Sequence, residues 1–328
     1  MPPRILVARA VFPEVVARLR EHFEVETNDD DTEWPSQELS RRLQGKAGLL
    51  CTAGERIDAT LLDAHPQLRA VCLMTVGYNN VDVPACTARG VLASNAPGVL
   101  TETTADLGFA LMMAAARRMA EAEGYLRSGQ WTKWRYDLLV GSDVHGATLG
   151  ILGMGRIGQA IARRGALGFG MKVLYHNRSR LPEADESPLG ARFVDKATLL
   201  RESDHLVLVL PYSAASHHAV GAAELALMKP TATLTNVARG GIVDDAALAA
   251  ALRERRIAAA GLDVFENEPQ VHPALLELSN VVLLPHIGSA TEATRRAMVG
   301  CAADNLIAAL TGGMPPTPIN PEVLAPRD

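Results

Sequence analysis

The sequence predicts an α/β protein with doubly wound parallel sheets, and three observations support this prediction. Short apolar runs with the length of buried strands alternate with segments of helical periodicity. A G-x-G-x-x-G turn at Gly153, Gly155 and Gly158 joins one apolar run to a helix-compatible segment. The 328 residues are many for one hydrophobic core, so we expect two domains, the second smaller than the first.

The first third of the chain contains three predicted strands, at residues 4–8, 47–51 and 68–74. An amphipathic helix is expected at 13–22, with Val15, Val16 and Leu19 on one side. Two strands end in loops of small residues, 52–54 and 75–80. Ligands of open parallel sheets bind outside the carboxyl ends of strands, so these loops are candidate substrate contacts. A simple chain reversal at Gly77 explains the spacing equally well.

Residues 96–98, Ala-Pro-Gly, interrupt the alternation and predict a hinge. A long helix is expected at 105–126, with an apolar stripe made by Leu107, Ala110, Leu111 and Ala114. So apolar a helix suggests burial between domains or subunits. The next segment contains Trp131, Trp134 and Tyr136 in a chain with few aromatic residues. These side chains predict either an interface or a cap on the long helix.

The glycine-rich turn predicts a dinucleotide site. Gly153 permits the sharp reversal, Gly155 lets the backbone approach a pyrophosphate, and Gly158 lets the helix pack closely on the strand. The helix N-terminus offers free N–H groups to the phosphates. A merely structural turn is the alternative, but the strand before it and the helix after it favour a Rossmann-type cofactor domain.

The segment after the next strand, at 171–175, distinguishes the two nicotinamide cofactors. NAD sites usually place Asp or Glu about 20 residues past the glycines, whereas Arg accommodates the 2′-phosphate of NADP. This chain has Asn177, Arg178, Ser179 and Arg180, with no acidic residue before Glu183. Arginine and serine donate hydrogen bonds to phosphate, so we expect NADP(H), with NAD(H) as the alternative. An ordinary polar surface loop also fits this composition.

Further strands are expected at 173–175, 205–210, 233–237, 259–264 and 280–284, with helices at 222–228 and 245–253. One ionisable residue closely follows each of the last three strands: Arg239, Glu268 and His286. Because the carboxyl ends of parallel strands share one edge of a sheet, these side chains should converge near the glycine-rich turn. Taken singly, each is more commonly a surface group.

Together the three side chains predict the reduction of a 2-oxo acid. Arg239 can grip a carboxylate with two parallel hydrogen bonds. His286 can give a proton to a carbonyl oxygen while hydride reaches the carbon. Glu268 can hold the other imidazole nitrogen and favour the imidazolium.

Composition and residue spacing argue against several other classes of protein. A net charge of −5 argues against a nucleic-acid-binding protein. No apolar run approaches the length of a membrane span, and no signal peptide is expected. The four cysteines form no C-x-x-C pair, so we expect reduced thiols in a cytoplasmic protein. The histidines show no H-E-x-x-H or H-x-H grouping, so no metal is expected.

Five segments, in order along the chain, resemble motifs of the D-isomer-specific 2-hydroxyacid dehydrogenases. They are VGYNNVD at 76–82, LGMGRIG at 152–158, NVARGG at 236–241, GLDVFENEP at 261–269 and LPHIGSAT at 284–291. Within that family, residues 141–170 and the Arg178 region are most similar to glyoxylate/hydroxypyruvate and 2-ketogluconate reductases. The resemblance implies the same roles for Arg239, Glu268 and His286.

The resemblance also implies further contacts. The backbone N–H groups of Val76 and Gly77 would bind the substrate carboxylate, and Trp134 would reach the active site of a partner subunit. Asp263 would bind the nicotinamide carboxamide. The expected cofactor contacts are Thr104, Gly153, Gly155, Arg156, Ile157, Asn177, Arg178, Ser179, Leu210, Pro211, Ser216, Val237, Ala238, Asp263 and Gly288.

The implied architecture is a homodimer of two-domain chains. Residues 1–96 and 289–328 would form a smaller flavodoxin-like substrate domain, and 97–288 the dinucleotide domain with a dimerisation arm at 97–141. The resemblance favours reduction of glyoxylate, hydroxypyruvate or 2-ketogluconate with NADPH. An NAD-dependent dehydrogenase of another D-2-hydroxy acid and a cofactor-sensing interaction protein are the alternatives.

Overall fold

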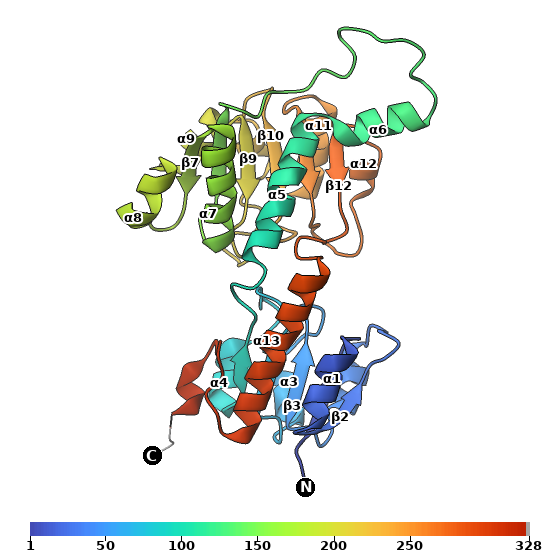
Figure 1. Cartoon of the computed structure of the whole chain (residues 1–328), viewed down its shortest axis with the longest axis vertical. Coiled ribbons are helices and arrows are strands. Elements are labelled where there is room, and N and C mark those ends of the chain that lie inside the picture. The colour runs from blue at the N-terminus through green and yellow to red at the C-terminus, as the bar shows by residue number, and fades with distance from the viewer. Residues whose placement is uncertain (326–328) are drawn as a thin grey trace. The chain divides into compact units, whose positions relative to one another are not determined.

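The computed structural model describes residues 1–325 and divides the chain into two compact units. The first unit consists of Met1–Leu100 and the segment from Thr291 onward, and the second of Thr101–Ala290. Each unit is built on one parallel sheet with helices on both faces (Figure 1). The predicted α/β class is therefore confirmed. Within the described residues, no helix is long and apolar enough to cross a membrane.

The sheet of the first unit has the strand order β2-β1-β3-β4-β5, which is the order of flavodoxin-like sheets. Its strands are β1 (Arg4–Val7), β2 (Glu24–Thr27), β3 (Gly48–Cys51), β4 (Ala70–Leu73) and β5 (Leu92–Ser94). The sequence predicted β1, β3 and β4 and missed both edge strands. β2 is the polar segment Glu-Val-Glu-Thr, and β5 has only three residues, so neither shows a buried-strand pattern.

Helices cover both faces of this sheet. One face carries α1 (Pro13–Arg20) and α13 (Glu292–Thr311), and the other carries α2 (Ser36–Arg42), α3 (Ala59–Ala64) and α4 (Val83–Arg89). The buried side of α1 is the predicted one, with Val15, Val16 and Leu19. The long helix α13 lies along the sheet so closely that a Cβ on Gly48 would clash with its leucines (Figure 1). A short 3-10 turn, η3 (Pro321–Leu324), follows.

The sheet of the second unit has the order β12-β11-β10-β9-β6-β7-β8, in which the chain reverses direction across the sheet beside β6. This is the Rossmann order with one further parallel strand. The strands are β6 (Thr148–Leu152), β7 (Lys172–His176), β8 (Arg192–Phe193), β9 (His205–Leu208), β10 (Thr233–Asn236), β11 (Ala259–Leu262) and β12 (Val281–Leu283). The carboxyl ends of β6, β10, β11 and β12 consequently lie along one edge.

Two layers of helix cover this second sheet. Helices α5 (Thr101–Ala116) and α7 (Arg156–Arg163) pack on one face, where Figure 1 shows them side by side. The other face carries α9 (Lys196–Glu202), α10 (Ala222–Leu225), α11 (Asp245–Arg253) and α12 (Pro273–Leu276). The remaining elements are α6 (Met119–Arg127), α8 (Glu183–Glu186), the π-helical turn η1 (Arg164–Gly168) and the 3-10 turn η2 (Ser187–Leu189).

The prediction of one helix over 105–126 was wrong. The chain forms α5 and α6, separated at Arg118, whose φ of +53° is incompatible with a continuous helix. The predicted stripe was also misplaced, because Ala110 is exposed while Ala105, Phe109 and Met112 are buried. Nearly every residue of α5 after Asp106 is apolar, so periodicity could not identify the buried side.

Candidate active site

The glycine-rich turn between β6 and α7, with Gly153, Gly155 and Gly158, exposes backbone without side chains, and we call it the dinucleotide cradle. Gly153 has a φ of +102°, and a Cβ there would lie 2.6 Å from the backbone nitrogen of Leu210. A Cβ on Gly158 would lie 2.5 Å from the carbonyl oxygen of Gly153, so only glycine allows this approach. At Gly155 a Cβ would meet nothing within 4 Å. The space beside Gly155, at the N-terminus of α7, fits the pyrophosphate of a dinucleotide.

The loop after β7 contains one occupied and one free arginine. Arg180 donates to the buried carboxylate of Glu186 at 2.7 Å, which also accepts from Tyr175. Hydrogen bonding to Arg180 lowers the pKa of Glu186. Within residues 1–325, neither Arg178 nor Ser179 has a hydrogen bond or ion pair, and both are exposed. Of the two arginines, Arg178 is therefore the one available to an anion.

Asn177 connects this loop to the glycine-rich turn. Its Oδ1 accepts a hydrogen bond from the backbone N–H of Met154 at 2.6 Å. The side chain thereby fixes the start of the 177–180 loop beside Gly153 and Gly155. Asn177 thus holds the loop and remains a predicted cofactor contact, and the adjacent Arg178 and Ser179 are free to meet a ligand.

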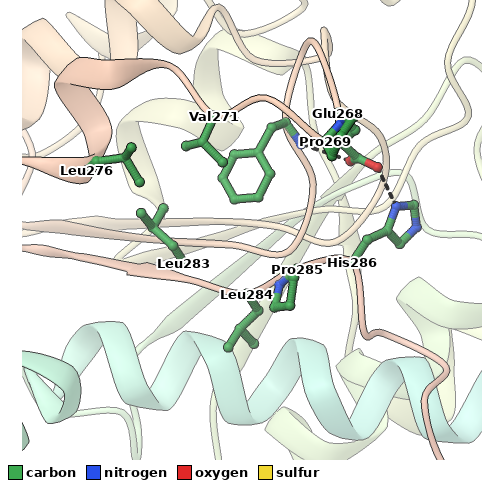
Figure 2. Close-up of a pocket in the computed structure, with 9 residues that line it drawn as sticks. Glu268, Pro269, Val271, Leu276, Leu283, Leu284, Pro285 and His286 are labelled. Carbon is green, nitrogen blue, oxygen red and sulfur yellow. Dashed lines mark hydrogen bonds and ion pairs between the residues drawn. The ribbon is translucent and has the colours of Figure 1, made fainter.

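His286 and Glu268 form a direct pair at the carboxyl edge of the same sheet. Nδ1 of His286 lies 2.7 Å from Oε2 of Glu268, as Figure 2 shows. The other carboxylate oxygen, Oε1, accepts from the backbone N–H of Phe265 at 2.9 Å. Both oxygens of Glu268 are thus engaged, and Nε2 of His286 has no partner among the described residues.

The electrostatics of Glu268 determine the tautomer of His286. Burial raises the pKa of Glu268, but the hydrogen bond and charge of His286, the Phe265 N–H and the charge of Arg239 outweigh it. The pKa of Glu268 is therefore below its usual value. An ionised carboxylate can only accept hydrogen bonds, so Nδ1 of His286 must carry a proton. When protonated, Nε2 can then deliver a proton to a substrate oxygen.

Arg239 lies at the end of β10, in a turn held by backbone packing. Gly240 lies so close to the next loop that a Cβ there would be 1.6 Å from the carbonyl oxygen of Phe265. This contact brings the Arg239 turn against the loop that carries Glu268. Burial lowers the pKa of Arg239, and Glu268 partly opposes the shift. An arginine remains charged at neutral pH, so the half-buried guanidinium can bind a carboxylate.

Asp263 positions the loop that carries His286. This carboxylate is 1% exposed and accepts from the backbone N–H groups of Ile287 at 2.7 Å and Gly288 at 2.8 Å. Burial raises the pKa of Asp263 more than these hydrogen bonds and the charge of His286 lower it. His286 itself has a φ of +53°, which is uncommon for a non-glycine residue. The chain spacing offered no signal for this loop clamp.

An apolar pocket of about 270 Å³ adjoins the His286–Glu268 pair. Figure 2 shows the imidazole and carboxylate at one side of it and Val271, Leu276 and Leu283 at the other. Leu276 is 64% exposed and the side chain of His286 is 44% exposed, so solvent still reaches both sides of the pocket. The wall of the pocket is apolar, but both members of the pair remain open to solvent.

Comparison with known proteins agrees with this geometry. Residues 109–288 match the family model of the D-isomer specific 2-hydroxyacid dehydrogenase, NAD binding domain. A glyoxylate reductase of Thermococcus onnurineus is 48% identical over 100% of this chain and 98% of its own length. The chain belongs to the D-isomer-specific 2-hydroxyacid dehydrogenase family. It is accordingly an NAD(P)-dependent oxidoreductase.

Other members of the family are also similar over their full lengths. A glyoxylate/hydroxypyruvate reductase B of Klebsiella pneumoniae is 46% identical over 98% of this chain and 100% of its own. The crystal structure of an NADPH-dependent glyoxylate/hydroxypyruvate reductase from Sinorhizobium meliloti, in complex with NADP and malonate, is 37% identical. It has a TM-score of 0.88 and covers 100% of both chains.

The other cofactor contacts expected in this dehydrogenase lie around the same edge. Arg156 and Ile157 begin α7, Val237 and Ala238 follow β10, and Leu210 and Pro211 follow β9. Thr104 is buried in α5 next to Gly288, whose added Cβ would lie 3.4 Å from its methyl group. Ser216 is buried, and its hydroxyl donates to the carbonyl of Pro211 at 2.9 Å. These positions remain predicted contacts.

The predicted substrate loop of the dehydrogenase, at Val76 and Gly77, lies in the first unit at the carboxyl end of β4. Side chains hold both carbonyl groups: Asn95 Nδ2 donates to Val76 O at 2.7 Å, and Thr75 Oγ1 donates to Gly77 O at 2.9 Å. Among the described residues, nothing accepts a hydrogen bond from the N–H groups of Val76 and Gly77. These donors are free, as carboxylate binding requires.

The aromatic segment after α6 is exposed in the isolated chain. Trp134 is 71% and Tyr136 92% exposed, and their rings meet edge to face at 5.7 Å. The alternative in which these rings cap the long helix is not what the structure shows, because most of their surface is uncovered. Trp134 therefore lies outside the cluster formed by Arg239, Glu268 and His286 in one chain.

Within the described part of the chain, His217, His218 and Glu266 are close enough together to be considered as metal ligands. The two imidazole rings, however, stack 3.9 Å apart, and Nε2 of His218 lies 2.9 Å from Glu266. Tetrahedral coordination spreads ligands around an ion, which two nearly parallel adjacent rings do not do. We interpret this group as a hydrogen-bonded network between strand-end loops.

Proposed function

We propose that this dehydrogenase reduces glyoxylate or hydroxypyruvate to the corresponding 2-hydroxy acid, which has the D configuration where it is chiral, with NADPH as the hydride donor. The observation that carries the proposal is the His286–Glu268 pair at 2.7 Å, beside the charged Arg239 and the dinucleotide cradle. Curated relatives with 48% and 46% identity that bear the names of glyoxylate and glyoxylate/hydroxypyruvate reductases support this choice of substrate.

In the proposed mechanism, Arg239 grips the substrate carboxylate and directs the 2-oxo group toward His286. The Val76 and Gly77 N–H groups are the further expected donors to that carboxylate. The cradle at Gly153, Gly155 and Gly158 would hold a nicotinamide dinucleotide, which would supply the hydride for the carbonyl carbon. Protonated Nε2 of His286 gives its proton to the carbonyl oxygen, while Glu268 holds Nδ1 and stabilises the imidazolium form before transfer.

The preference for NADPH rests on the arginines after β7. Arg178 and Ser179 have no partner among the described residues, whereas Arg180 is held by Glu186. A 2′-phosphate would therefore meet Arg178 first. The NADP complex of the Sinorhizobium meliloti relative, at 37% identity, supports this inference.

The experiment compares initial rates of NADPH and NADH oxidation with hydroxypyruvate, glyoxylate and 2-ketogluconate at matched concentrations. We expect the first two substrates and NADPH to give the faster rates. Arg178→Ala should reduce kcat/KM for NADPH about tenfold and leave NADH unaltered, because only NADP carries the lost contact. Arg180→Ala is the matched control.

Three results would change the proposal. Faster oxidation of NADH than of NADPH would contradict a 2′-phosphate site at Arg178 and would favour an NAD-dependent dehydrogenase. Equal losses with both cofactors in Arg178→Ala would mean that the side chain does not contact the phosphate. Absence of oxidation with all three acids would favour another 2-oxo acid or a cofactor-sensing interaction protein.

We also infer that the enzyme is a homodimer that acts in the cytoplasm. The support for the dimer is the exposed apolar surface of α6 and the following segment, to which Leu126, Trp131, Trp134 and Val140 contribute. Sedimentation of the wild type and of Trp134→Ser at micromolar concentration tests the interface. A wild-type monomer would contradict the inference.

A further inference from the structure

The predicted carboxylate-binding loop of the first unit is attached to the C-terminal segment through three polar side chains, of which Asn305 is fully buried and Asn95 and Thr317 are partly buried. Asn95, which donates to the carbonyl of Val76, is itself held by Thr317. The Thr317 hydroxyl donates to the Asn95 carbonyl at 2.5 Å, and the Asn95 N–H donates to Thr317 O at 3.4 Å. A residue more than 200 positions away in the sequence thus fixes the backbone of Asn95.

Thr317 is fixed in turn by Asn305 on α13. The Asn305 amide donates to the Thr317 hydroxyl at 2.8 Å, and its Oδ1 accepts from the Thr317 N–H at 2.9 Å. Asn305 is fully buried, and its amide also donates to the carbonyl of Cys301 one turn earlier in the helix. Every hydrogen-bonding atom of the Asn305 side chain is therefore used, so the helix holds Thr317 in one orientation.

Pairing of the C-terminal segment with β5 adds a second restraint on Asn95. Pro318 forms an antiparallel bridge with Ser94 at the edge of the sheet, and the N–H of Ile319 donates to the carbonyl of Ala93 at 2.8 Å. The C-terminal segment therefore runs alongside β5 up to Asn95, the residue before the predicted hinge at 96–98. Ala96, which follows Asn95, donates to the carbonyl of Thr75 at 3.0 Å. The carbonyl groups of Thr75 and Val76 are consequently both held by Asn95 and the residue after it.

We propose that the Asn305–Thr317–Asn95 relay positions the Val76–Gly77 loop for the substrate carboxylate. The proposal rests on the proposed function, because it assumes that the free N–H groups of this loop bind that carboxylate. Thr317 is a positioning residue that touches no substrate and acts through Asn95. By holding the Val76 carbonyl, the relay keeps the adjacent N–H groups turned outward, where a carboxylate can meet them before any loop rearrangement.

The test replaces the hydroxyl without changing the shape of residue 317. Thr317→Val removes the donor to Asn95, and Thr317→Ser keeps it. A neutral hydrogen bond of this kind contributes about fivefold in an equilibrium constant. We expect Thr317→Val to raise KM for hydroxypyruvate by about that factor, with kcat and the dissociation constant of NADPH within about twofold of the wild type. Thr317→Ser should restore the wild-type KM.

Thr87→Val is the matched control. The Thr87 hydroxyl accepts from Asn320 at 3.1 Å and so also holds the C-terminal segment, yet it makes no contact with Asn95 or the loop. If Thr317→Val acted only by destabilising the C-terminal segment, and not by moving the Val76–Gly77 loop, Thr87→Val should change KM by a similar factor. Equal KM values for Thr317→Val, Thr87→Val and wild type would overturn the relay, and so would equal increases in the two valine variants.

Binding of oxamate, an unreactive carboxylate, separates this inference from the proposed function. Quenching of NADPH fluorescence gives its dissociation constant without turnover. Weaker oxamate binding in Thr317→Val alone supports the relay even if no 2-oxo acid is reduced, in which case only the proposed function fails. Unaltered oxamate binding in an enzyme that does reduce hydroxypyruvate overturns the relay and leaves the proposed function intact.

Discussion

Replacing Glu268 by glutamine tests how His286 is held. The substitution keeps the size of the side chain but removes the charge that accepts from Nδ1 at 2.7 Å. Hydrogen bonds to charged groups contribute about 1.5–3 kcal/mol. The side chains of His286 and Glu268 are 44% and 32% exposed, so solvent screens the pair and about 1–2 kcal/mol is the appropriate range. This energy corresponds to a loss of about fivefold to thirtyfold in kcat.

The assay measures kcat with saturating hydroxypyruvate and NADPH, together with the dissociation constant of NADPH. Cofactor binding should be unaltered, because Glu268 bonds to Nδ1 of His286 and is not one of the predicted cofactor contacts. Glu266→Gln is the matched control, since this neighbouring carboxylate pairs with His218 and not with His286. A kcat for Glu268→Gln within twofold of wild type, or an equal loss in Glu266→Gln, would refute the reasoning.

Three further outcomes are expected. Arg239→Lys should raise KM for the oxo acid about tenfold with a smaller change in kcat, because an ammonium group cannot form two parallel hydrogen bonds with a carboxylate. An unaltered KM would show that Arg239 does not bind the substrate carboxylate. Gly155→Val should leave Tm unaltered, since a Cβ at this position meets no atom within 4 Å. It should raise the dissociation constant of NADPH at least about tenfold, because the added side chain occupies the space for the pyrophosphate. Unaltered NADPH binding in a fluorescence titration would contradict the assignment of the glycine-rich turn as the dinucleotide site. The pKa of Glu268 is lowered on folding, so its contribution to stability is present above its ordinary pKa of 4.5 and is lost as the pH falls through the lowered value. Acid denaturation followed by circular dichroism should therefore be shallower below about pH 5 in Glu268→Gln than in wild type, and superimposable curves would exclude this linkage.

The strand pattern of the second unit was predictable because its central strands are buried on both faces. Their apolar runs are bounded by turn residues, and the alternation with helices implies parallel order. The edge strands β2, β5 and β8 escaped prediction for the opposite reason. They are short or partly polar, and what makes them strands is pairing with a neighbour that the local sequence does not describe.

The proximity of Glu268 and His286 was predictable on the same grounds, since each lies in the loop that follows one of two neighbouring strands, β11 and β12. The choice between Arg178 and Arg180 could not be made in this way. It depends on Glu186, which reaches Arg180 only because the chain folds back through α8 and buries the carboxylate beside Tyr175. The Asn305–Thr317–Asn95 relay was equally invisible, because it joins residues that are more than 200 positions apart.

Contacts with backbone atoms help to bring the strand-end loops of the second unit together. Gly240 touches Phe265, Gly153 touches the backbone of Leu210, and Asp263 binds the N–H groups after His286. Any Cβ at Gly240 or Gly153 would displace a loop, whereas Gln at Glu268 or Lys at Arg239 leaves these contacts in place. Substitutions of Gly153 or Gly240 should consequently reduce stability and activity together, while substitutions of Arg239, Glu268 or His286 should change kinetics in a correctly folded enzyme.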